Sequence, residues 1–247
     1  NHSSAASDVY KRQIQRHMNQ GIPKTVADLA MMGRGGNQHT TMGTSGEPDR
    51  NYRFQDMFFE NAYHVRSLAL STLKKEHDNP INDSNPRYPG IRSKVDPVLQ
   101  LKIKTELELG LLLEINQFEA WYHLTPGIHG EGLYHNDTFQ LSGMIYLNDK
   151  NPIPDESGTY IGKRLHESKM GKPYADACSS HDEEVITAFN TIKEEYNRTN
   201  FETVHVIHNY YNRLIAYEGR TPHRAGCYFG TDFEDSRLTL TFFYDTK

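Results

Sequence analysis

The chain has 247 residues, of which 36% are hydrophobic, so it is long enough to bury a substantial core as one domain with additional segments. Its formal net charge of -5 lacks the basic excess of a general nucleic-acid-binding protein, and no apolar run is long enough to span a membrane. Two cysteines do not make a disulfide scaffold, and the N-terminus lacks a signal-peptide pattern, so we expect a protein of the reducing cytoplasm.

The first fifty residues are predicted to form an extension of short helices and a loop. Apolar residues recur at helical spacing over residues 6–20, and a second short helix follows Pro23 and stops at Gly33. Residues 33–50 are rich in Gly, Thr, Asn and Ser, a composition typical of loops. We therefore divide the chain into an N-terminal extension, 1–50, and a main domain, 51–247.

Two longer helices are predicted at the start of the main domain. The first spans roughly residues 61–75, where the apolar side chains share one face. The second begins at Asp96-Pro97, an N-cap followed by proline at the first helical position, and runs to about Glu108. Residues 78–93, between these helices, contain three prolines among Asn and Asp residues and predict a long loop.

From residue 110 onward the pattern changes to short strands. The predicted strands are Leu111–Asn116, Phe118–Leu124, Leu141–Leu147, Thr159–Lys163, Thr203–His208, Leu214–Tyr217 and Leu238–Tyr244. An insertion at 164–200 interrupts them and contains a predicted helix, Glu183–Tyr196. Helices followed by many strands indicate a mainly β fold of the α+β class, in which helices flank a β-sandwich or jelly roll.

Two segments far apart in the chain can supply ligands for one metal ion. Side chains two positions apart on an extended segment point the same way, so His135 and Asp137 can converge while Asn136 points elsewhere. His223 would then arrive from a later strand. Two imidazoles and one carboxylate can cap one face of a ferrous ion and leave the opposite positions open. Triplets of this kind also arise by chance in a chain with 13 histidines, so the surrounding sequence has to decide.

Arg237 heads the last predicted strand and is a candidate for binding a carboxylate. Leu238 and Leu240 point to one face of that strand, so Arg237 and Thr239 share the other. A buried arginine requires an anionic partner, and no acidic residue stands near it on the strand. A carboxylate cosubstrate could accept two parallel hydrogen bonds from the guanidinium. The alternative is an ordinary surface arginine.

The order of these motifs resembles the prolyl-hydroxylase-like branch of the Fe(II)/2-oxoglutarate-dependent oxygenases, with similarity to a bacterial and phage-type subset of it. The resemblance covers roughly residues 55–247. Its motifs, in order, are Trp121-Tyr122, His135-Asn136-Asp137, Ile145-Tyr146-Leu147-Asn148, Ser157-Gly158-Thr159-Tyr160, Asn212–Tyr217, Pro222-His223 and Arg237-Leu238-Thr239. The chain departs from the family pattern in the 14 positions that separate His223 from Arg237 and in the insertion at 164–200.

The resemblance implies a double-stranded β-helix, or jelly-roll, core and an enzymatic function. His135, Asp137 and His223 would bind Fe(II), and 2-oxoglutarate would chelate the metal and extend to Arg237. With O2 as the second cosubstrate, the enzyme would hydroxylate an unactivated C–H bond of a peptide, amino acid or small metabolite. Tyr146 stands where the family often has a phenol that hydrogen-bonds the same carboxylate. Tyr122 and Thr239 are further candidates of this kind, and a tyrosine at these positions also fits an ordinary core.

Two other functions remain open at this stage. One is a non-catalytic jelly roll, such as a phage structural or ligand-binding protein that retains the fold. The other is a zinc hydrolase of similar shape, which would need neither oxygen nor Arg237. In the resembled superfamily, halogenating members carry Gly or Ala in place of the acidic ligand, so Asp137 implies hydroxylation. The segments 33–50 and 164–200 are candidate lids.

Overall fold

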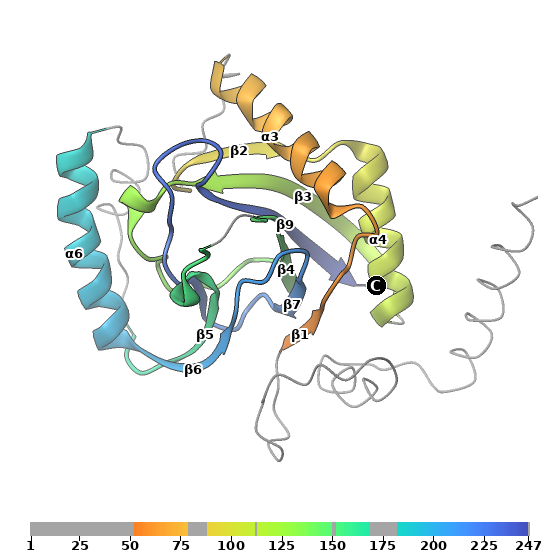
Figure 1. Cartoon of the computed structure of the whole chain (residues 1–247). Helices are drawn as coiled ribbons and strands as arrows, with labels where there is room; N and C mark the ends of the chain where they lie inside the picture. Colours follow the sequence, from red (N-terminus) through yellow and green to blue (C-terminus); the bar gives the residue numbers. More distant parts are fainter. Residues whose placement is uncertain (1–51, 79–87, 112, 150–151, 168–181, 247) are drawn as a thin grey trace, which may run out of the picture.

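A computed structural model of the chain describes residues 52–78, 88–111, 113–149, 152–167 and 182–246. The predicted N-terminal extension, including the loop at 33–50, lies outside the described residues, as do residues 168–181 of the predicted insertion. The described residues form two antiparallel sheets, with helices at both sides (Figure 1).

The larger sheet has six strands in the order β1-β7-β4-β9-β3-β2, and the smaller has three in the order β6-β5-β8. Their bounds in chain order are β1 Tyr52–Gln55, β2 Ile91–Lys94, β3 Ile115–Thr125, β4 Leu141–Tyr146, β5 Thr159–Arg164, β6 Phe201–Ile207, β7 Leu214–Glu218, β8 His223–Ala225 and β9 Arg237–Thr246. An isolated bridge between His135 and His223 adds the segment before β4 to the smaller sheet.

Successive segments alternate between the two sheets, which defines the topology. After β3 in the larger sheet, the chain pairs with β8 at His135, returns to the larger sheet in β4 and crosses to the smaller sheet in β5 and β6. It then alternates again through β7, β8 and β9. Antiparallel strands wound in this way form a double-stranded β-helix, or jelly roll. The predicted fold class, mainly β with flanking helices, is confirmed.

The two faces of the larger sheet bury different side chains. The outer face packs against helices α3 (Ala62–Asp78) and α4 (Pro97–Leu111) through one apolar cluster that includes Leu73, Ile103, Ile145, Leu240 and Phe242. The inner face contributes Met144, Tyr146, Ile215 and Tyr217 to a second cluster, which Ile161 and Ile207 of the smaller sheet complete. Because side chains alternate along a strand, β4 and β7 each contribute one row of side chains to each cluster.

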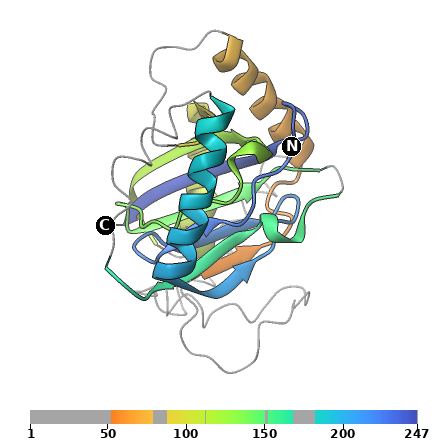
Figure 2. The same ribbon diagram turned by 90° about the vertical axis from the view of Figure 1, so that its left-hand side faces the viewer.

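Helix α6 (Glu183–Asn200) lies on the opposite side of the molecule from α4 and contacts β6 and the short helix η1 (Gly127–His129) (Figures 1 and 2). Its N-cap, Asp182, accepts a hydrogen bond from the Glu184 backbone N–H at 2.9 Å. Asp96 caps α4 in the same way and accepts from the N–H groups of Val98 and Leu99. Both caps satisfy donors that a helix start otherwise leaves unpaired.

Three expectations about the elements need correction. Helix α4 continues to Leu111, so the two strands predicted at 111–116 and 118–124 are a single strand, β3, with an irregularity in pairing between Ile115 and Gln117. Strands β1 and β2 were not predicted, and β2 lies in the segment expected to be a loop. Both have four residues and lie at sheet edges, where pairing with a longer neighbour stabilises a strand that has little pattern of its own.

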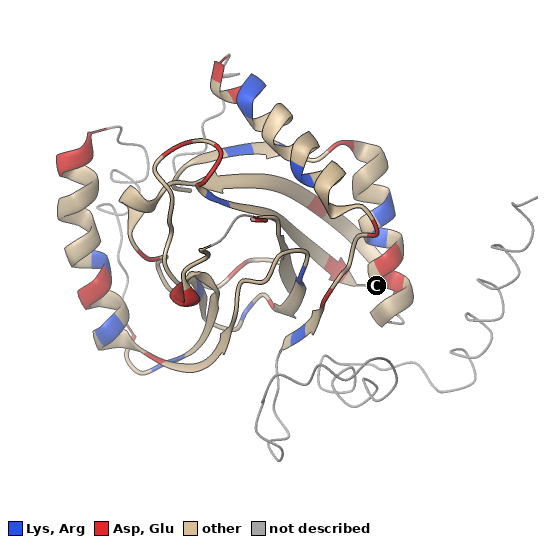
Figure 3. Cartoon of the chain, viewed as in Figure 1, with Lys and Arg blue, Asp and Glu red and all other residues tan. Residues whose placement is uncertain are grey.

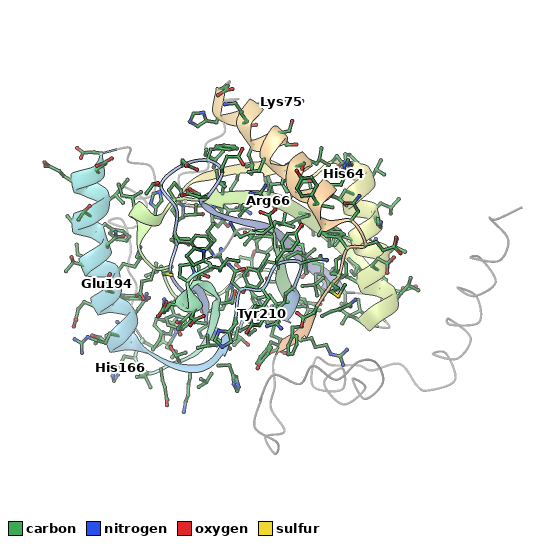
Figure 4. All side chains as sticks on the ribbon, viewed as in Figure 1. His64, Arg66, Lys75, His166, Glu194 and Tyr210 are labelled. Carbon is green, nitrogen blue, oxygen red and sulfur yellow. The ribbon has the colours of Figure 1, made fainter. Side chains whose placement is uncertain are left out.

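Two buried arginines tie the first elements to the sheets. Arg66, which is labelled on α3 in Figure 4, contacts the Asp149 carboxylate at 2.8 Å. Arg213 binds both oxygens of Asp56, at 2.5 and 2.8 Å. Asn212, at a φ of 61°, exchanges two hydrogen bonds with the backbone of Phe59.

On the helices, acidic and basic residues are interspersed (Figure 3). In the described part of the chain, no helix combines the length and apolarity that crossing a membrane requires.

Candidate metal centre

The pairing of His135 with His223 brings two distant segments together. The backbone N–H of each residue donates to the carbonyl of the other at 3.0 Å, so the two lie directly opposite each other. Side chains of directly opposed residues in an antiparallel pair project to the same face. Asp137 follows two positions later, and its N–H donates to the Gly219 carbonyl at 2.7 Å. These contacts place all three predicted ligands on one side of the segment.

The ligand atoms have the spacing of a metal site. Asp137 Oδ2 lies 3.2 Å from His223 Nε2, and Asp137 Oδ1 lies 3.6 Å from His135 Nε2. One ligand atom from each of the three residues lies within 4.8 Å of the other two. Ligands at right angles around an ion, with bonds of roughly 2.0–2.2 Å, stand about 3 Å apart. Small side-chain adjustments would therefore suffice to bind one ion.

Backbone carbonyls orient both imidazoles. Nδ1–H of His135 donates to the Leu133 carbonyl and Nδ1–H of His223 to the Thr221 carbonyl, each at 2.9 Å. With the proton held on Nδ1, a neutral ring has its Nε2 lone pair free, and in both residues Nε2 faces Asp137. The local backbone thus selects the tautomer that a metal-binding histidine requires, with the proton on Nδ1 and the lone pair on Nε2.

Asp137 is held as a carboxylate. Burial raises its pKa, but the hydrogen bond with His223 and the charges of both imidazoles in their protonated form, a charge that a bound cation would replace, outweigh burial and bring the pKa to about 2. The side chains of Asp137 and His223 are largely buried, whereas that of His135 is 47% exposed. The cluster therefore lies at the mouth of the barrel, with one side toward the interior and one toward solvent.

Gly219 makes room for the Asp137 segment, and Gly219→Ala is expected to damage it. A Cβ at this position would lie 2.3 Å from the Phe139 carbonyl oxygen, 2.9 Å from Ser142 Oγ and 3.3 Å from Asp137 Cβ. Forced movement of backbone in a packed region costs about 1–3 kcal/mol of unfolding free energy. We expect that loss in urea unfolding, together with weaker divalent-metal binding in a calorimetric titration.

The matched control is Gly110→Ala in the exposed last turn of α4. A Cβ at Gly110 would meet nothing within 4 Å, so this variant should gain about 0.5–1 kcal/mol from helix propensity and bind metal normally. Equal stability and equal metal affinity in both glycine variants would contradict the role assigned to Gly219.

Arg237 is buried at the start of β9, with 3% of its surface exposed. Its Nε donates to the Ser157 carbonyl at 3.1 Å, Nη2 approaches the Met144 sulfur at 3.6 Å, and the guanidinium carbon lies 5.7 Å from the centre of the Tyr146 ring. Among the described residues, no carboxylate lies within ion-pair distance, 4.0 Å, of this cation. A buried guanidinium without an acidic partner is costly unless a ligand supplies the anion.

Thr239 and Tyr146 share the inner face with Arg237. They lie opposite each other in the pairing of β4 with β9. The Tyr146 hydroxyl hydrogen-bonds Thr159 Oγ1 at 2.7 Å, whereas Thr239 Oγ1 is buried and has no hydrogen-bond partner in the described part of the chain. The structure therefore places both predicted residues beside Arg237 on the inner face of the larger sheet. We call this region between the two sheets the chamber.

Tyr122, by contrast, lies on the other face of the sheet. It pairs with Leu240 and packs in the apolar cluster beneath α3 and α4. The positions of β3 that share a face with Arg237 and Thr239 are Thr125 and His123, which lie directly opposite them. The phenol of Tyr122 therefore faces away from the chamber, because a shift of one position along a strand reverses the face. Tyr122 is therefore too far from the inner face to bind a ligand held by Arg237.

Tyr217 and His123 also lie in the chamber, although the sequence suggested no role for Tyr217 and indicated only a core or surface histidine at His123. The Tyr217 ring packs against His223 with centroids 4.5 Å apart, and burial raises its pKa well above the ordinary value. The charges of both Asp137 and Arg237 act on the same phenol, which links the metal cluster to the arginine. His123 donates from Nε2 to the Pro89 carbonyl at 2.7 Å, and burial lowers its pKa to about 3, so it stays neutral.

A separate small cavity lies between α6 and η1. His129, Leu133, Phe189 and Lys193 are among its lining residues, and none of the three metal-cluster residues is. Lys193 Nζ donates to the His129 carbonyl and to Asn190 Oδ1 there. Its lining also includes Tyr228, whose ring centre lies 5.8 Å from the Arg237 guanidinium carbon.

No protein-family model and no curated protein sequence matches the chain. Solved structures with similar folds include a prolyl-4-hydroxylase from Pseudomonas putida (18% identity, 78% of this chain and 91% of that chain covered, TM-score 0.44). Another is a prolyl hydroxylase from Trichoplax adhaerens in complex with a hypoxia inducible factor peptide (13%, 78% and 83%, 0.47). A third is HygX from Streptomyces hygroscopicus with nickel and 2-oxoglutarate bound (13%, 78% and 82%, 0.45).

Proposed function

We propose that this protein is an Fe(II)- and 2-oxoglutarate-dependent oxygenase of the prolyl-hydroxylase-like type, with residues 51–247 as its catalytic domain. One observation carries the proposal: the His135, Asp137 and His223 cluster and the unpaired Arg237 guanidinium belong to one chamber of a jelly roll. A metal cluster alone would fit many functions, and a buried arginine alone would fit many anions. Together they match a cosubstrate that is a metal chelator at one end and a carboxylate at the other.

The donor set fits ferrous iron. Two neutral imidazole nitrogens and one carboxylate oxygen on one side of an ion leave the opposite positions for a chelating cosubstrate and oxygen. If bound there, Fe(II) would supply the chemistry needed to hydroxylate an unactivated C–H bond, with O2 as the oxidant and 2-oxoglutarate as the electron donor that is converted to succinate and CO2. The hydrogen bonds that the two imidazoles donate to the Leu133 and Thr221 carbonyls would keep the rings oriented for that ion.

The remaining chamber residues position and shield. Arg237 would hold the distal carboxylate of 2-oxoglutarate with two N–H donors. Thr239 Oγ1, now without a partner among the described residues, and the Tyr146 hydroxyl would complete the hydrogen bonds to the same group. The apolar side chains of Met144, Ile161 and Ile215 exclude water from the chamber, which strengthens these polar contacts.

Oxygen-dependent release of succinate tests the proposal directly. The purified chain is loaded anaerobically with Fe(II), mixed with 2-oxoglutarate and exposed to O2, and succinate is quantified. We expect slow release even without a primary substrate, and no release when Fe(II) is replaced by Zn(II), when O2 is excluded, or in His223→Ala.

Other outcomes identify other functions. Tight metal and 2-oxoglutarate binding without any succinate would indicate a binding protein that retains the fold. Hydrolytic activity of the zinc-loaded protein without oxygen would indicate a hydrolase. Either result would overturn the oxygenase proposal.

A further inference from the structure

A second arginine, Arg92, lies on the rim of the same chamber. It belongs to the edge strand β2 and pairs with His123, which in turn lies opposite Thr239. Directly opposed residues project to the same face, so Arg92 lies on the inner face of the sheet. It is partly buried, and its position at the last strand places it where the chamber opens.

Aromatic rings hold the Arg92 guanidinium. Its carbon lies 4.0 Å from the centre of the Tyr88 ring, 5.0 Å from that of Trp121 and 6.0 Å from that of Phe243. Aromatic neighbours attract the cation and restrict its plane, while the N–H groups at the edge of a stacked guanidinium remain able to bind an anion. The arrangement therefore presents a fixed fork of donors.

Arg92 lacks an ion-pair partner among the described residues. No carboxylate there lies within 4.0 Å of it, and its Nε is buried without a hydrogen-bond acceptor. Burial lowers the pKa of Arg92, whereas the adjacent Tyr88 phenol and the charges of Asp137 and Glu119 raise it. A cation held by rings rather than by an acid is available to an incoming ligand.

Aromatic rings extend from Arg92 toward the metal cluster. The rings of Phe243 and Phe139 are 5.7 Å apart, and Phe139 follows Asp137 by two positions. Phe243 also lies opposite Ser142 in the pairing of β4 with β9, and the buried Ser142 side chain lies beside Asp137 next to Gly219. A molecule bound to Arg92 would therefore lie beside the face of the cluster that opens to solvent at His135.

We infer that Arg92 binds the carboxylate of the primary substrate, and that Tyr88, Trp121 and Phe243 form the apolar wall against which that substrate lies. The inference rests on the proposed oxygenase function, because it assigns the substrate of that reaction. It names the class as molecules with a free carboxylate and an aliphatic portion that reaches the metal. A single guanidinium near Asp137 and Glu119 favours one negative charge over the two of a phosphate ester.

Binding to Arg92 can be measured independently of turnover, because Trp121 is the single tryptophan of the chain. The full-length protein is loaded with Mn(II) and saturating 2-oxoglutarate and titrated with short aliphatic acids and N-acetylated aliphatic amino acids, each paired with its primary amide. We expect at least one acid to change Trp121 emission saturably, and its amide to bind tenfold to hundredfold more weakly.

Three variants separate recognition from general charge effects. Arg92→Gln should reduce the affinity for the acid to that of the amide, and Arg92→Lys should recover part of the difference. Lys94→Gln is the matched control, because Lys94 is exposed, lies on the same strand as Arg92 and approaches the Trp121 ring at 5.2 Å. The affinity of this variant for the acid should stay within twofold of the wild type. Circular dichroism melts confirm that each variant is folded.

Several results would overturn the inference. These are equal binding of acid and amide, undiminished acid binding in Arg92→Gln, an equal loss in Lys94→Gln, or no response to any acid of the panel. Failure of the proposed function is seen separately, as absence of Fe(II)- and O2-dependent succinate release by the wild-type protein. An acid preference that depends on Arg92 in a protein that forms no succinate would retain the site and reject the reaction.

Discussion

Asp137→Ala is expected to abolish specific metal binding. Asp137 is the anionic member of the cluster, and its pKa of about 2 keeps it charged at every pH at which the protein would work. Loss of a residue that supports a metal ligand reduces affinity by about 10–100-fold, and loss of the anionic ligand itself should exceed that range. Calorimetric titration with Mn(II) measures the affinity, and a metal-dependent rise in melting temperature should disappear in the variant.

Asn136→Ala is the matched control for this substitution. Asn136 lies between two predicted ligands, but its side chain donates to the Arg220 carbonyl and accepts from Arg164, away from the three ligand side chains. The metal affinity of Asn136→Ala should therefore equal that of the wild type. Because Asp137 fills the position that a halide would need, wild-type turnover should also be independent of chloride. Unchanged Mn(II) affinity in Asp137→Ala, or a chlorinated product from the wild type, would contradict the assignment of Asp137.

Arg237→Met is expected to have opposite effects on the free and the ligand-bound protein. Without cosubstrate, replacing an unpaired buried cation by an apolar side chain of similar length should leave the unfolding free energy unchanged or raise it. In the metal-loaded protein, 2-oxoglutarate affinity should fall by about 1.5–3 kcal/mol, the scale of hydrogen bonds to a charged group. Urea unfolding and calorimetric titration measure the two quantities.

Arg213→Met provides the contrast, because Arg213 is equally buried but is bound by both oxygens of Asp56. Breaking a buried ion pair by removing one partner costs about 3–5 kcal/mol in fully buried cases, and somewhat less is expected here because Asp56 is 41% exposed. An Arg237 variant that is destabilised like Arg213→Met and binds 2-oxoglutarate normally would show that Arg237 serves the fold.

The residues that sequence reasoning brought together are those whose placement depends on local periodicity. His135 and Asp137 share a face because they are two positions apart on an extended segment, and Arg237 shares a face with Thr239 for the same reason. The start of α4 was predicted from an equally local signal, because the N-cap Asp96 stands directly before Pro97. Side-chain alternation and capping need no knowledge of distant residues.

The residues that sequence reasoning misplaced or missed depend on pairing between distant strands. Whether Tyr122 or His123 faces Arg237 is set by the register of β3 against β9, and these strands are more than 100 residues apart in the chain. Arg92 lies in no motif, and the motif that contains Tyr217 suggested no role for its side chain. Their positions near the metal cluster and Arg237 depend on the pairing of β7 and β2 in the sheet.

The most direct measurement is an experimental structure of the chain with Fe(II) and 2-oxoglutarate bound under anaerobic conditions. We expect one iron, bound by Nε2 of His135, a carboxylate oxygen of Asp137 and Nε2 of His223 at roughly 2.0–2.2 Å. The distal carboxylate of 2-oxoglutarate should accept hydrogen bonds from Arg237 and Thr239. Iron bound elsewhere, or a cosubstrate whose distal carboxylate leaves Arg237 without an anionic partner, would contradict the proposed site.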